Sequence, residues 1–467
     1  MKKKQMTMYL VLTVLVCLIP LIGLLWKKSA ESSENRVLSS FPVLKTEEGW
    51  NFEFLSDAGN WFEEHFAYRQ EMVTADALLR GTLFGVSTED GVIKGTDGWL
   101  YYKDSLSDYL GDDLLSDRSI FNIAHTLKMM QDYVEQNGGD FLFTVAPNKN
   151  SLYDEHMPYY YRVKAGQTRN IDKLIPVLQS QGVHYVDLHA AFESQDEVLY
   201  HMRDSHWNNK GAALAAEMLF DALGRAHPDY AQAEFTVEKD YEGDLDAMLY
   251  PLAITAEDEI YYTDLFSYEY VTEVGSNFDP EIQTTQMQAT GGLLMYRDSF
   301  GNALLPFMAQ EYQTAKFSRG IPYYLDDMFL YNADTVIVER AERFLPDMTV
   351  SPPVVQAPEV QIELPESSAD SMPGTSCQVA NEGMYIRISG AIDESLMDKE
   401  SRIYLQIDGN KYEAFPMNIT QAGIKSDYGY TAYIERGRLQ SAEISAELYV
   451  DTNGEIRKVY QTTANIS

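Results

Sequence analysis

Apolar residues along the chain recur in two patterns, and the pattern changes near residue 346. Between residues 119 and 338, periodic helix-like segments alternate with short apolar runs. The periodic segments cover 119–136, 170–181 and 212–223, and the apolar runs cover 141–145, 183–188, 293–296 and 335–338. Strands separated by helices predict a parallel sheet with helices on both faces.

The C-terminal part has the alternating pattern of β-strands. Strand-like runs cover 384–388, 403–407, 412–415, 430–434, 444–450 and 456–460. Asp408-Gly409-Asn410 and Asn453-Gly454 are typical hairpin turns. A segment with six prolines, 346–373, precedes these runs and predicts an extended linker. We therefore expect a separate all-β domain, most similar to a small sandwich.

The N-terminal run 6–26 contains no charged residue and follows three lysines. Its 21 residues span roughly 30 Å as a helix, which matches one bilayer crossing. A cleavable signal peptide is the rival interpretation, but Lys27-Lys28-Ser29 offers no small-residue cleavage site. We therefore predict an uncleaved single-pass anchor with a cytoplasmic N-terminus and the remaining chain outside the cytoplasm.

These patterns divide the chain into five predicted segments. A long helix over 52–83 and a hairpin over 92–100 are expected between the anchor and the first strand of the sheet. The segments are a transmembrane anchor at 6–26, a juxtamembrane and helical lead-in at 27–90, an α/β domain at 91–345, a Pro-rich linker at 346–376 and a β-sandwich-like domain at 377–467.

The net charge limits the possible partners, and the cysteine content limits the possible disulfides. The chain has 71 acidic and 36 basic residues, with a net charge of -35, which argues against nucleic acid as a partner. Its two cysteines, one of them inside the apolar run, provide no disulfide framework.

Candidate chemistry lies in two short motifs. In Asp204-Ser205-His206-Trp207, an acid and an imidazole two positions apart share one side of an extended segment, so the carboxylate can orient the ring. In Arg297-Asp298-Ser299, the serine follows an apolar run and precedes a helix-like stretch. A serine at a strand-to-helix turn lies beside free helix N–H groups. Together Ser299, His206 and Asp204 suggest a nucleophilic triad. A surface loop and a helix-capping serine are the alternative.

Four further residues are candidates for binding the substrate or an oxyanion. Asn148 and Lys149 follow a strand, so they are expected at the carboxyl edge of the sheet, where they can bind the substrate or an oxyanion. The alternative is that they only end that strand. Trp207 forms a wall of the site or part of the core. Arg297 binds a substrate carboxylate or makes a structural ion pair.

A metal site is the weaker interpretation of the histidine-rich region. His201, Asp204 and His206 include residue types that bind zinc, but their spacing matches no common signature. His184 and His189 are expected to be packing or surface residues. We therefore predict neither a metal nor a cofactor.

Several motifs in one order resemble the membrane-anchored SGNH-hydrolase-like O-acetyltransferases of the alginate acetylation type, including the so-called DHHW proteins. The resemblance covers about residues 35–344. Its motifs are Asn35-Arg36, Phe41-Pro42, Trp61-Phe62, His65-Phe66, Gly95-Thr96-Asp97-Gly98-Trp99-Leu100, Ala146-Pro147-Asn148-Lys149, Asp204-Ser205-His206-Trp207-Asn208 and Arg297-Asp298-Ser299-Phe300. Ser205 stands where some relatives have His, and Arg297 replaces the Gly of the usual Gly-Asp-Ser.

The resemblance implies a permuted SGNH-like α/β fold with Ser299 as nucleophile, His206 as base and Asp204 as its orienting acid. It also implies O-acetylation of a polysaccharide, with acetyl supplied by a membrane-bound O-acyltransferase. A carbohydrate esterase with the same triad and a non-catalytic polysaccharide-binding protein remain alternatives. The C-terminal domain lies outside the resemblance, and carbohydrate binding is only suggested for it.

Overall fold

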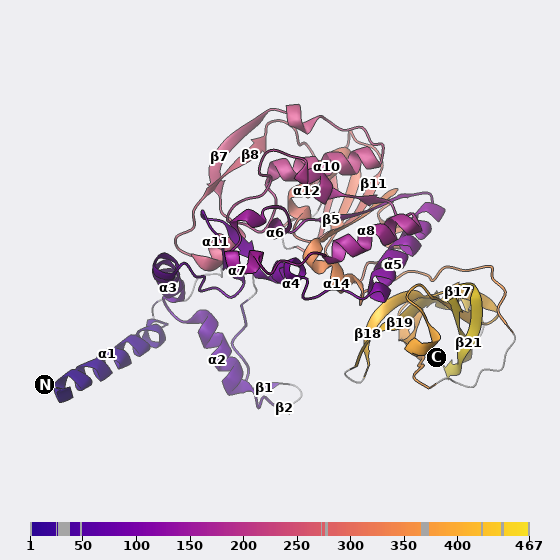
Figure 1. The fold of residues 1–467 in the computed structure, drawn as a ribbon, viewed down its shortest axis with the longest axis horizontal. Coiled ribbons are helices and arrows are strands. Elements are labelled where there is room, and N and C mark those ends of the chain that lie inside the picture. Colours follow the sequence, from indigo (N-terminus) through magenta and orange to yellow (C-terminus); the bar gives the residue numbers. More distant parts are fainter. Residues whose placement is uncertain are drawn as a thin grey trace.

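A seven-stranded sheet forms the centre of the larger, α/β part of the protein, as seen in a computed structural model of the chain (Figure 1). The structure describes all residues except 1, 25, 27–37, 47–48, 272, 276–278, 366–372, 422–423, 440–442 and 466–467. Asn35-Arg36 and part of the predicted linker therefore lie outside the described residues.

The strand order in the central sheet is β6-β5-β13-β11-β12-β10-β9, and its first five strands are parallel. The last two strands pair antiparallel at one edge. The bounds are β5 Asp140–Ala146, β6 Tyr185–Val186, β9 Glu269–Tyr270, β10 Glu281–Thr285, β11 Gly292–Tyr296, β12 Thr314–Ser318 and β13 Thr335–Ala341. The predicted parallel sheet is thus confirmed.

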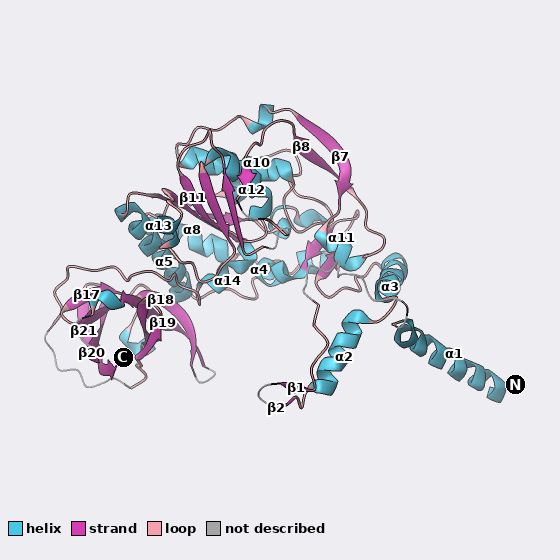
Figure 2. Cartoon of the chain, turned by 180° about the vertical axis from the view of Figure 1, so that it is seen from behind, coloured by secondary structure: helices cyan, strands magenta, loops and turns pink. Residues whose placement is uncertain are grey.

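Helices cover both faces of this sheet (Figure 2). Alternate residues of the central strands face opposite layers, so Leu293 packs under α10 and α12 while Leu294 packs under α5 and α8. These helices are α5 Asp117–Gln136, α8 Asn170–Gln181, α10 Asn209–Ala222 and α12 Gly301–Glu311. Burial on both faces explains why the strands read as continuous apolar runs.

Shorter elements connect and flank these layers. The other helices are α1 Lys2–Gly23, α2 Phe54–His65, α3 Arg69–Phe84, α4 Leu106–Leu110, α6 Lys149–Leu152, α7 Tyr159–Arg162, α9 Leu188–Glu193, α11 Asp244–Leu249, α13 Asp327–Leu330 and α14 Leu345–Met348. The 3-10 turns are η1 Lys103–Ser105, η2 Asp154–His156, η3 Tyr230–Gln232, η4 Glu342–Phe344, η5 Glu394–Leu396 and η6 Arg436–Arg438. Three small two-stranded sheets pair β1 Lys45–Thr46 with β2 Gly49–Trp50, β3 Val92–Lys94 with β4 Leu100–Tyr102, and β7 Phe235–Tyr241 with β8 Glu257–Tyr262.

The C-terminal unit consists of two four-stranded antiparallel sheets around a shared apolar core, which confirms the all-β prediction. One sheet has the order β14-β15-β19-β18 and the other β17-β16-β20-β21. Their bounds are β14 Gln378–Glu382, β15 Tyr385–Ala391, β16 Arg402–Ile407, β17 Asn410–Glu413, β18 Phe415–Gln421, β19 Ile424–Glu435, β20 Glu443–Thr452 and β21 Glu455–Asn465. Positive φ at Asp408, Gly409, Asn453 and Gly454 confirms the two predicted hairpin turns.

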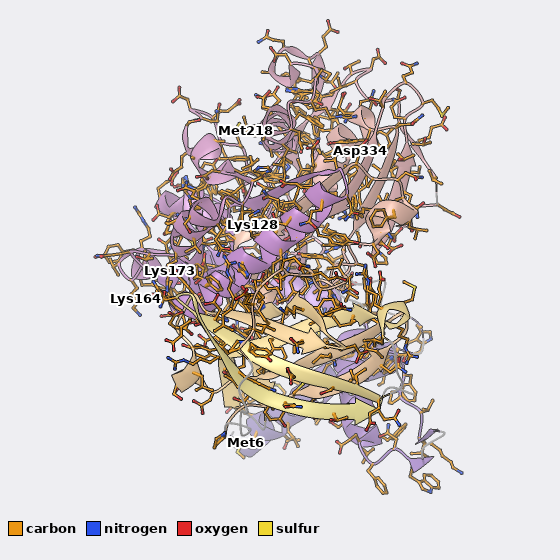
Figure 3. The ribbon with its side chains drawn as sticks, turned by 90° about the vertical axis from the view of Figure 1, so that its right-hand side faces the viewer. Met6, Lys128, Lys164, Lys173, Met218 and Asp334 are labelled. Atoms are coloured by element: carbon orange, nitrogen blue, oxygen red, sulfur yellow. The ribbon has the colours of Figure 1, made fainter. Side chains whose placement is uncertain are left out.

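The β unit lies directly against helix α5, which carries the labelled Lys128 (Figure 3). The buried side chain of Arg118 donates to the carbonyl oxygens of Ser401 (2.7 Å) and Lys399 (3.3 Å). Asn122 on the same helix donates to Asn418 of β18 at 3.0 Å. Polar bonds from one helix therefore attach the β unit to the α/β unit.

The Pro-rich segment also packs between the two units. Val355 contributes to a core of the α/β unit, and Ala357 contributes to the core of the β unit. Val354 forms a small apolar cluster with Tyr385 and Tyr433. The first part of this segment is therefore fixed by packing on both sides.

The prediction of a transmembrane helix over 6–26 is wrong. Nowhere in the described part of the chain is a helix both long and apolar enough to cross a membrane. Helix α1 includes three lysines at its start and ends at Gly23. Among the described residues of the apolar run, 6–23 are helical, which is roughly 27 Å against the roughly 30 Å of a bilayer core. The single-pass location that was derived from this helix is corrected with it.

The helix predicted over 52–83 is two helices, α2 and α3. The break falls where Phe66 is extended and Tyr68 adopts a left-handed conformation with φ of 65°. No glycine or proline marks this break in the sequence, so periodicity alone could not locate it.

Arg118→Ala should loosen the contact between the two units. It removes charge-assisted bonds of a buried guanidinium, so we expect the free energy of unfolding to fall by about 1.5–3 kcal/mol. All five tryptophans precede residue 208. Every tryptophan therefore lies before the β unit, so tryptophan fluorescence follows that earlier part of the chain while circular dichroism follows the whole chain, and the two transitions should separate in urea.

Lys399→Ala is the matched control, because its exposed ammonium makes long ion pairs of 3.8–3.9 Å with described residues near the same contact. Equal unfolding behaviour of Arg118→Ala and Lys399→Ala would contradict the prediction.

Candidate active site

Ser299 lies in the turn between β11 and α12, at the carboxyl edge of the parallel sheet. The carboxylate of Asp298 shapes this turn by accepting from the backbone N–H of Phe300 (3.0 Å) and of Ala341 (2.6 Å). The second bond ties the turn to the end of the neighbouring strand β13. Both oxygens of Asp298 are thus used for structure, and the half-buried Ser299 hydroxyl is left to face His206.

A continuous chain of hydrogen bonds joins Ser299, His206 and Asp204. His206 Nε2 lies 2.8 Å from Ser299 Oγ, and His206 Nδ1 lies 2.7 Å from Asp204 Oδ1. With the proton on Nδ1, the ring donates to the carboxylate and presents Nε2 as acceptor for the hydroxyl. The structure therefore brings together the three residues predicted from two motifs more than 90 positions apart.

The Asp204 carboxylate is buried and accepts four hydrogen bonds. Oδ1 accepts from the backbone N–H and the ring of His206, while Oδ2 accepts from Tyr241 Oη (3.1 Å) and the N–H of Asp244 (2.8 Å). Burial alone would raise the pKa of Asp204, but the His206 charge and these bonds hold it well below its usual range. Asp204 therefore stays ionised beside the imidazole.

Burial opposes protonation of His206, but the charge and hydrogen bond of Asp204 and the charge of Asp244 together outweigh that effect. The resulting pKa of His206 is raised above its usual value, with a smaller contribution in the same direction from Asp244. An imidazole of this kind readily accepts a proton from a hydroxyl and holds it during a reaction.

The turn that carries Asp204 and His206 is held from several sides. An isolated antiparallel β-bridge between Tyr200 and Trp207 closes the turn. Glu257 of β8 accepts from the N–H groups of Met202 and Arg203, both at 2.7 Å. The geometry of the pair is thus fixed by tertiary contacts that the local motif does not reveal.

Lys149 is a buried clamp on this same turn. Its ammonium donates to three backbone carbonyl oxygens, those of His201, Met202 and Asp204. Burial is the main cause that lowers the pKa of Lys149, to about 8. All three of its N–H donors are therefore directed at the turn.

Asn148 and Arg343 follow the neighbouring strands β5 and β13, so they lie at the same sheet edge as Ser299. The Arg343 guanidinium lies 5.4 Å from the centre of the Phe300 ring and donates weakly, at 3.5 Å, to Asn148 Oδ1. Asn148 Nδ2 is buried, and no described residue accepts a hydrogen bond from it. An unpaired buried donor at this edge is suited to a developing negative charge.

Trp207 and Arg297 are buried rather than exposed at the site. Trp207 is 1% exposed and packs edge-on against Phe300, with ring centres 4.8 Å apart. Arg297 is 2% exposed and donates to the carbonyl of Asp298 and to Asn302. A Cβ on Gly301 would approach the Arg297 side chain to 2.6 Å, so this glycine lets helix α12 begin over it.

The histidines considered as metal ligands do not gather at one point. His201 Nε2 pairs with Glu259 at 2.9 Å, and its ring stacks on Tyr241. His184 and His189 lie beside Glu135 and Glu193.

A different set of potential ligand atoms lies together instead. Atoms of Asp204, His206 and Asp244 lie within 4.8 Å of one another. All four carboxylate oxygens in this set already accept hydrogen bonds from the protein.

Sequence reasoning missed Tyr241, Asp244 and Arg343. The first two lie about 40 positions after the motif that they contact and have no periodic relation to it. Arg343 lies five positions after the predicted strand 335–338, so its place near the carboxyl edge was a usable signal.

Comparison with known proteins found one matching family. Residues 92–274 match the family described as an SGNH hydrolase-like domain, acetyltransferase AlgX. The match includes Asp204 and His206 and ends before Ser299.

The chain is also similar to individual proteins. A probable alginate O-acetylase AlgJ of Pseudomonas syringae pv. tomato is 24% identical over 228 residues, which cover 46% of this chain. The match spans about half, 55%, of the length of that relative. Among solved structures, Bacillus cereus PatB1 has a TM-score of 0.44 at 16% identity, covering 54% of this chain and 96% of that structure. The O-acetyltransferase domain of Pseudomonas putida AlgJ has a TM-score of 0.37 at 19% identity, covering 55% and 92%.

Comparison of the wild type with Lys149→Met should reveal the cost of burying this charge, because that cost makes the free energy of unfolding depend on pH. The folded-state pKa of Lys149, about 8, lies below the value of about 10.4 in an unfolded chain. Between these values the unfolded state binds more protons, so this group makes stability rise with pH. The free energy of unfolding of the wild type, relative to Lys149→Met, should increase between pH 8 and 9.5 in urea titrations, by at most about 1.4 kcal/mol per pH unit.

The comparison between the two proteins cancels the titration of other groups. A difference that stays constant or shrinks as pH rises would show that Lys149 is not buried as a charge.

Proposed function

We propose that the protein is an O-acetyltransferase that acetylates a polysaccharide through an acetyl-Ser299 intermediate. The observation that carries this proposal is the hydrogen-bond chain from Asp204 through His206 to Ser299. The match of residues 92–274 to the family described as an SGNH hydrolase-like domain, acetyltransferase AlgX, supports it.

In the first half-reaction, Ser299 Oγ attacks the acetyl carbonyl carbon as its proton passes to His206 Nε2. The bond between the acetyl carbon and the donor oxygen then breaks, and His206 returns the proton to that leaving oxygen. In the second half-reaction, a sugar hydroxyl attacks the acetyl group and gives its proton to His206. Ser299 leaves and regains the proton, so the enzyme is restored.

Asp204 has an orienting and electrostatic role in this scheme. It holds the proton of His206 on Nδ1, which keeps Nε2 free to accept the serine proton, and it stabilises the imidazolium that results. Its four hydrogen bonds keep it ionised, so it does not take the proton itself.

Asn148 is the side-chain donor that we assign to the oxyanion. Its buried Nδ2 lacks an acceptor among the described residues, while Arg343 holds the other end of the amide. Lys149 supports the turn of the base instead, because its three donors are used there.

The acceptor and donor are proposed by resemblance. The relative described as a probable alginate O-acetylase supports a polysaccharide acceptor. A membrane-bound O-acyltransferase is the proposed source of acetyl. An esterase would use the same first half-reaction with water as acceptor, so the assay must measure both products.

Single substitutions of Ser299, His206 or Asp204, which form the hydrogen-bond chain, should each abolish most of the turnover. With a chromogenic acetyl ester, Ser299→Ala and His206→Ala should each lower kcat by on the order of 10⁶-fold, and Asp204→Ala by somewhat less. The double variant should lose no more than either single one, because the residues act as a unit. Normal activity in folded Ser299→Ala would place the nucleophile elsewhere.

Added oligosaccharides distinguish transfer from hydrolysis in the same assay. We expect acetylated oligosaccharide to form at the expense of free acetate, measured by mass spectrometry. Acetate as the sole product with every acceptor tested would favour the esterase.

Asn148→Ala should lower kcat by about 10²–10³-fold, as expected for loss of one oxyanion donor, with little change in KM. Asn150→Ala is the control, since Asn150 lies in the short helix α6 just after Asn148 and its side-chain amide donates to the backbone carbonyl of Ser105. Equal losses in both variants, or a loss confined to KM, would contradict the role assigned to Asn148.

A further inference from the structure

A second carboxylate, that of Asp244, approaches the catalytic imidazole. Asp244 Oδ2 lies 3.6 Å from His206 Nδ1, the same nitrogen that bonds to Asp204. Asp244 begins the short helix α11, so it reaches His206 from a separate element of the fold. Two acidic side chains thus face one side of a single ring.

Ser205 connects Asp244 to this ring. Its hydroxyl donates to Asp244 Oδ2 at 2.6 Å and lies 3.2 Å from His206 Nδ1. Its backbone N–H donates to Asp244 Oδ1 at 2.8 Å, and the N–H of Leu245 donates to the same oxygen at 2.7 Å. Every oxygen of Asp244 therefore has a donor that fixes its direction.

The two carboxylates are also joined to each other. The backbone N–H of Asp244 donates to Asp204 Oδ2 at 2.8 Å. A shift of Asp244 would thus move its own negative charge and also one hydrogen bond to Asp204.

We propose that Asp244, held by Ser205, is a second acidic positioning residue for His206 and stabilises its protonated form during acyl transfer. This inference rests on the proposed role of His206 as the base. Asp244 does not touch the substrate and takes no proton. It acts by adding negative charge beside the ring when the serine proton arrives at Nε2.

Other charged and titratable groups also lie around His206 and its turn, and they define the background of this effect. Groups that face the ring or its turn are Asp204 in the turn, Tyr241 of β7, Arg343 of η4, Lys149 of α6 and Glu257 of β8. Arg343 opposes protonation of His206, whereas Asp204 and Asp244 favour it. Burial and the charge of Asp204 raise the pKa of Asp244 itself, so the effect is to be measured above the range in which Asp244 titrates.

Asp244→Asn tests the proposal because the amide keeps the shape and an acceptor oxygen but removes the charge. Loss of an opposite charge at this distance should lower the pKa of His206 by about 1 unit. The direct readout is the titration of the His206 ring by NMR in protein labelled on its eight histidines, with the signal assigned through His206→Ala. The acidic limb of the pH profile of kcat/KM should move to lower pH by the same amount.

Glu242→Gln is the matched control. It removes one negative charge two positions away, but Glu242 is exposed, so water and salt should limit its effect to roughly a few tenths of a pKa unit. Asp244→Glu retains the charge and should bring the pKa of His206 back toward the wild-type value. If Asp244→Asn does not fold, Asp244→Ser replaces it, since its hydroxyl still accepts from a backbone N–H.

The ring titration separates failure of this inference from failure of the proposed function. Equal His206 pKa values in Asp244→Asn, Glu242→Gln and wild type would overturn the role of Asp244, whatever the activity. A lowered pKa in a protein that transfers no acetyl would retain the electrostatic role and overturn the proposed reaction.

Discussion

The arrangement of the site depends on the buried carboxylate of Asp204. A buried charge of this kind is costly unless hydrogen bonds replace its water, and here four donors from three segments do so. The same bonds that keep Asp204 ionised also fix the turn that carries His206. The charge of Asp204 and the position of His206 therefore depend on the same hydrogen bonds. Removing one donor would raise the pKa of Asp204 and loosen the His206 ring.

The parallel sheet brings distant segments of the chain to one edge, which the site also requires. Asn148, Arg343 and Ser299 follow three neighbouring strands, β5, β13 and β11. Ser299 is tied to β13 by the bond from Ala341 to Asp298, so the nucleophile is positioned by the rigid core. His206 comes from the side, on a turn that Lys149 and Glu257 clamp to the body of the domain. A reactive serine thus needs little motion to meet its base.

The sequence predicts the parts of the molecule that local patterns determine. The buried runs became β5, β11 and β13, and the positions of Ser299, His206 and Asp204 follow from two short motifs. Patterns do not report contacts between distant segments. The clamp made by Lys149 and the approach of Asp244 were invisible for that reason.

Two errors have the same origin in local information. Apolarity alone predicted a membrane-spanning helix over 6–26, but the helix ends at Gly23. Periodicity alone predicted one helix over 52–83, although a left-handed residue at Tyr68 divides it. The core position of Trp207 was one of two options left open by its sequence, because aromatic residues suit both a core and a sugar site.

The most direct test of the central claim is to look for the acetyl group on the protein. The wild type would be mixed with an activated acetyl ester, quenched in acid within milliseconds to seconds and digested. The account predicts a gain of one acetyl mass on the peptide that carries Ser299, and no gain on that peptide in Ser299→Ala. Turnover of the ester without any acetyl on Ser299, or acetyl on the same peptide in Ser299→Ala, would contradict it.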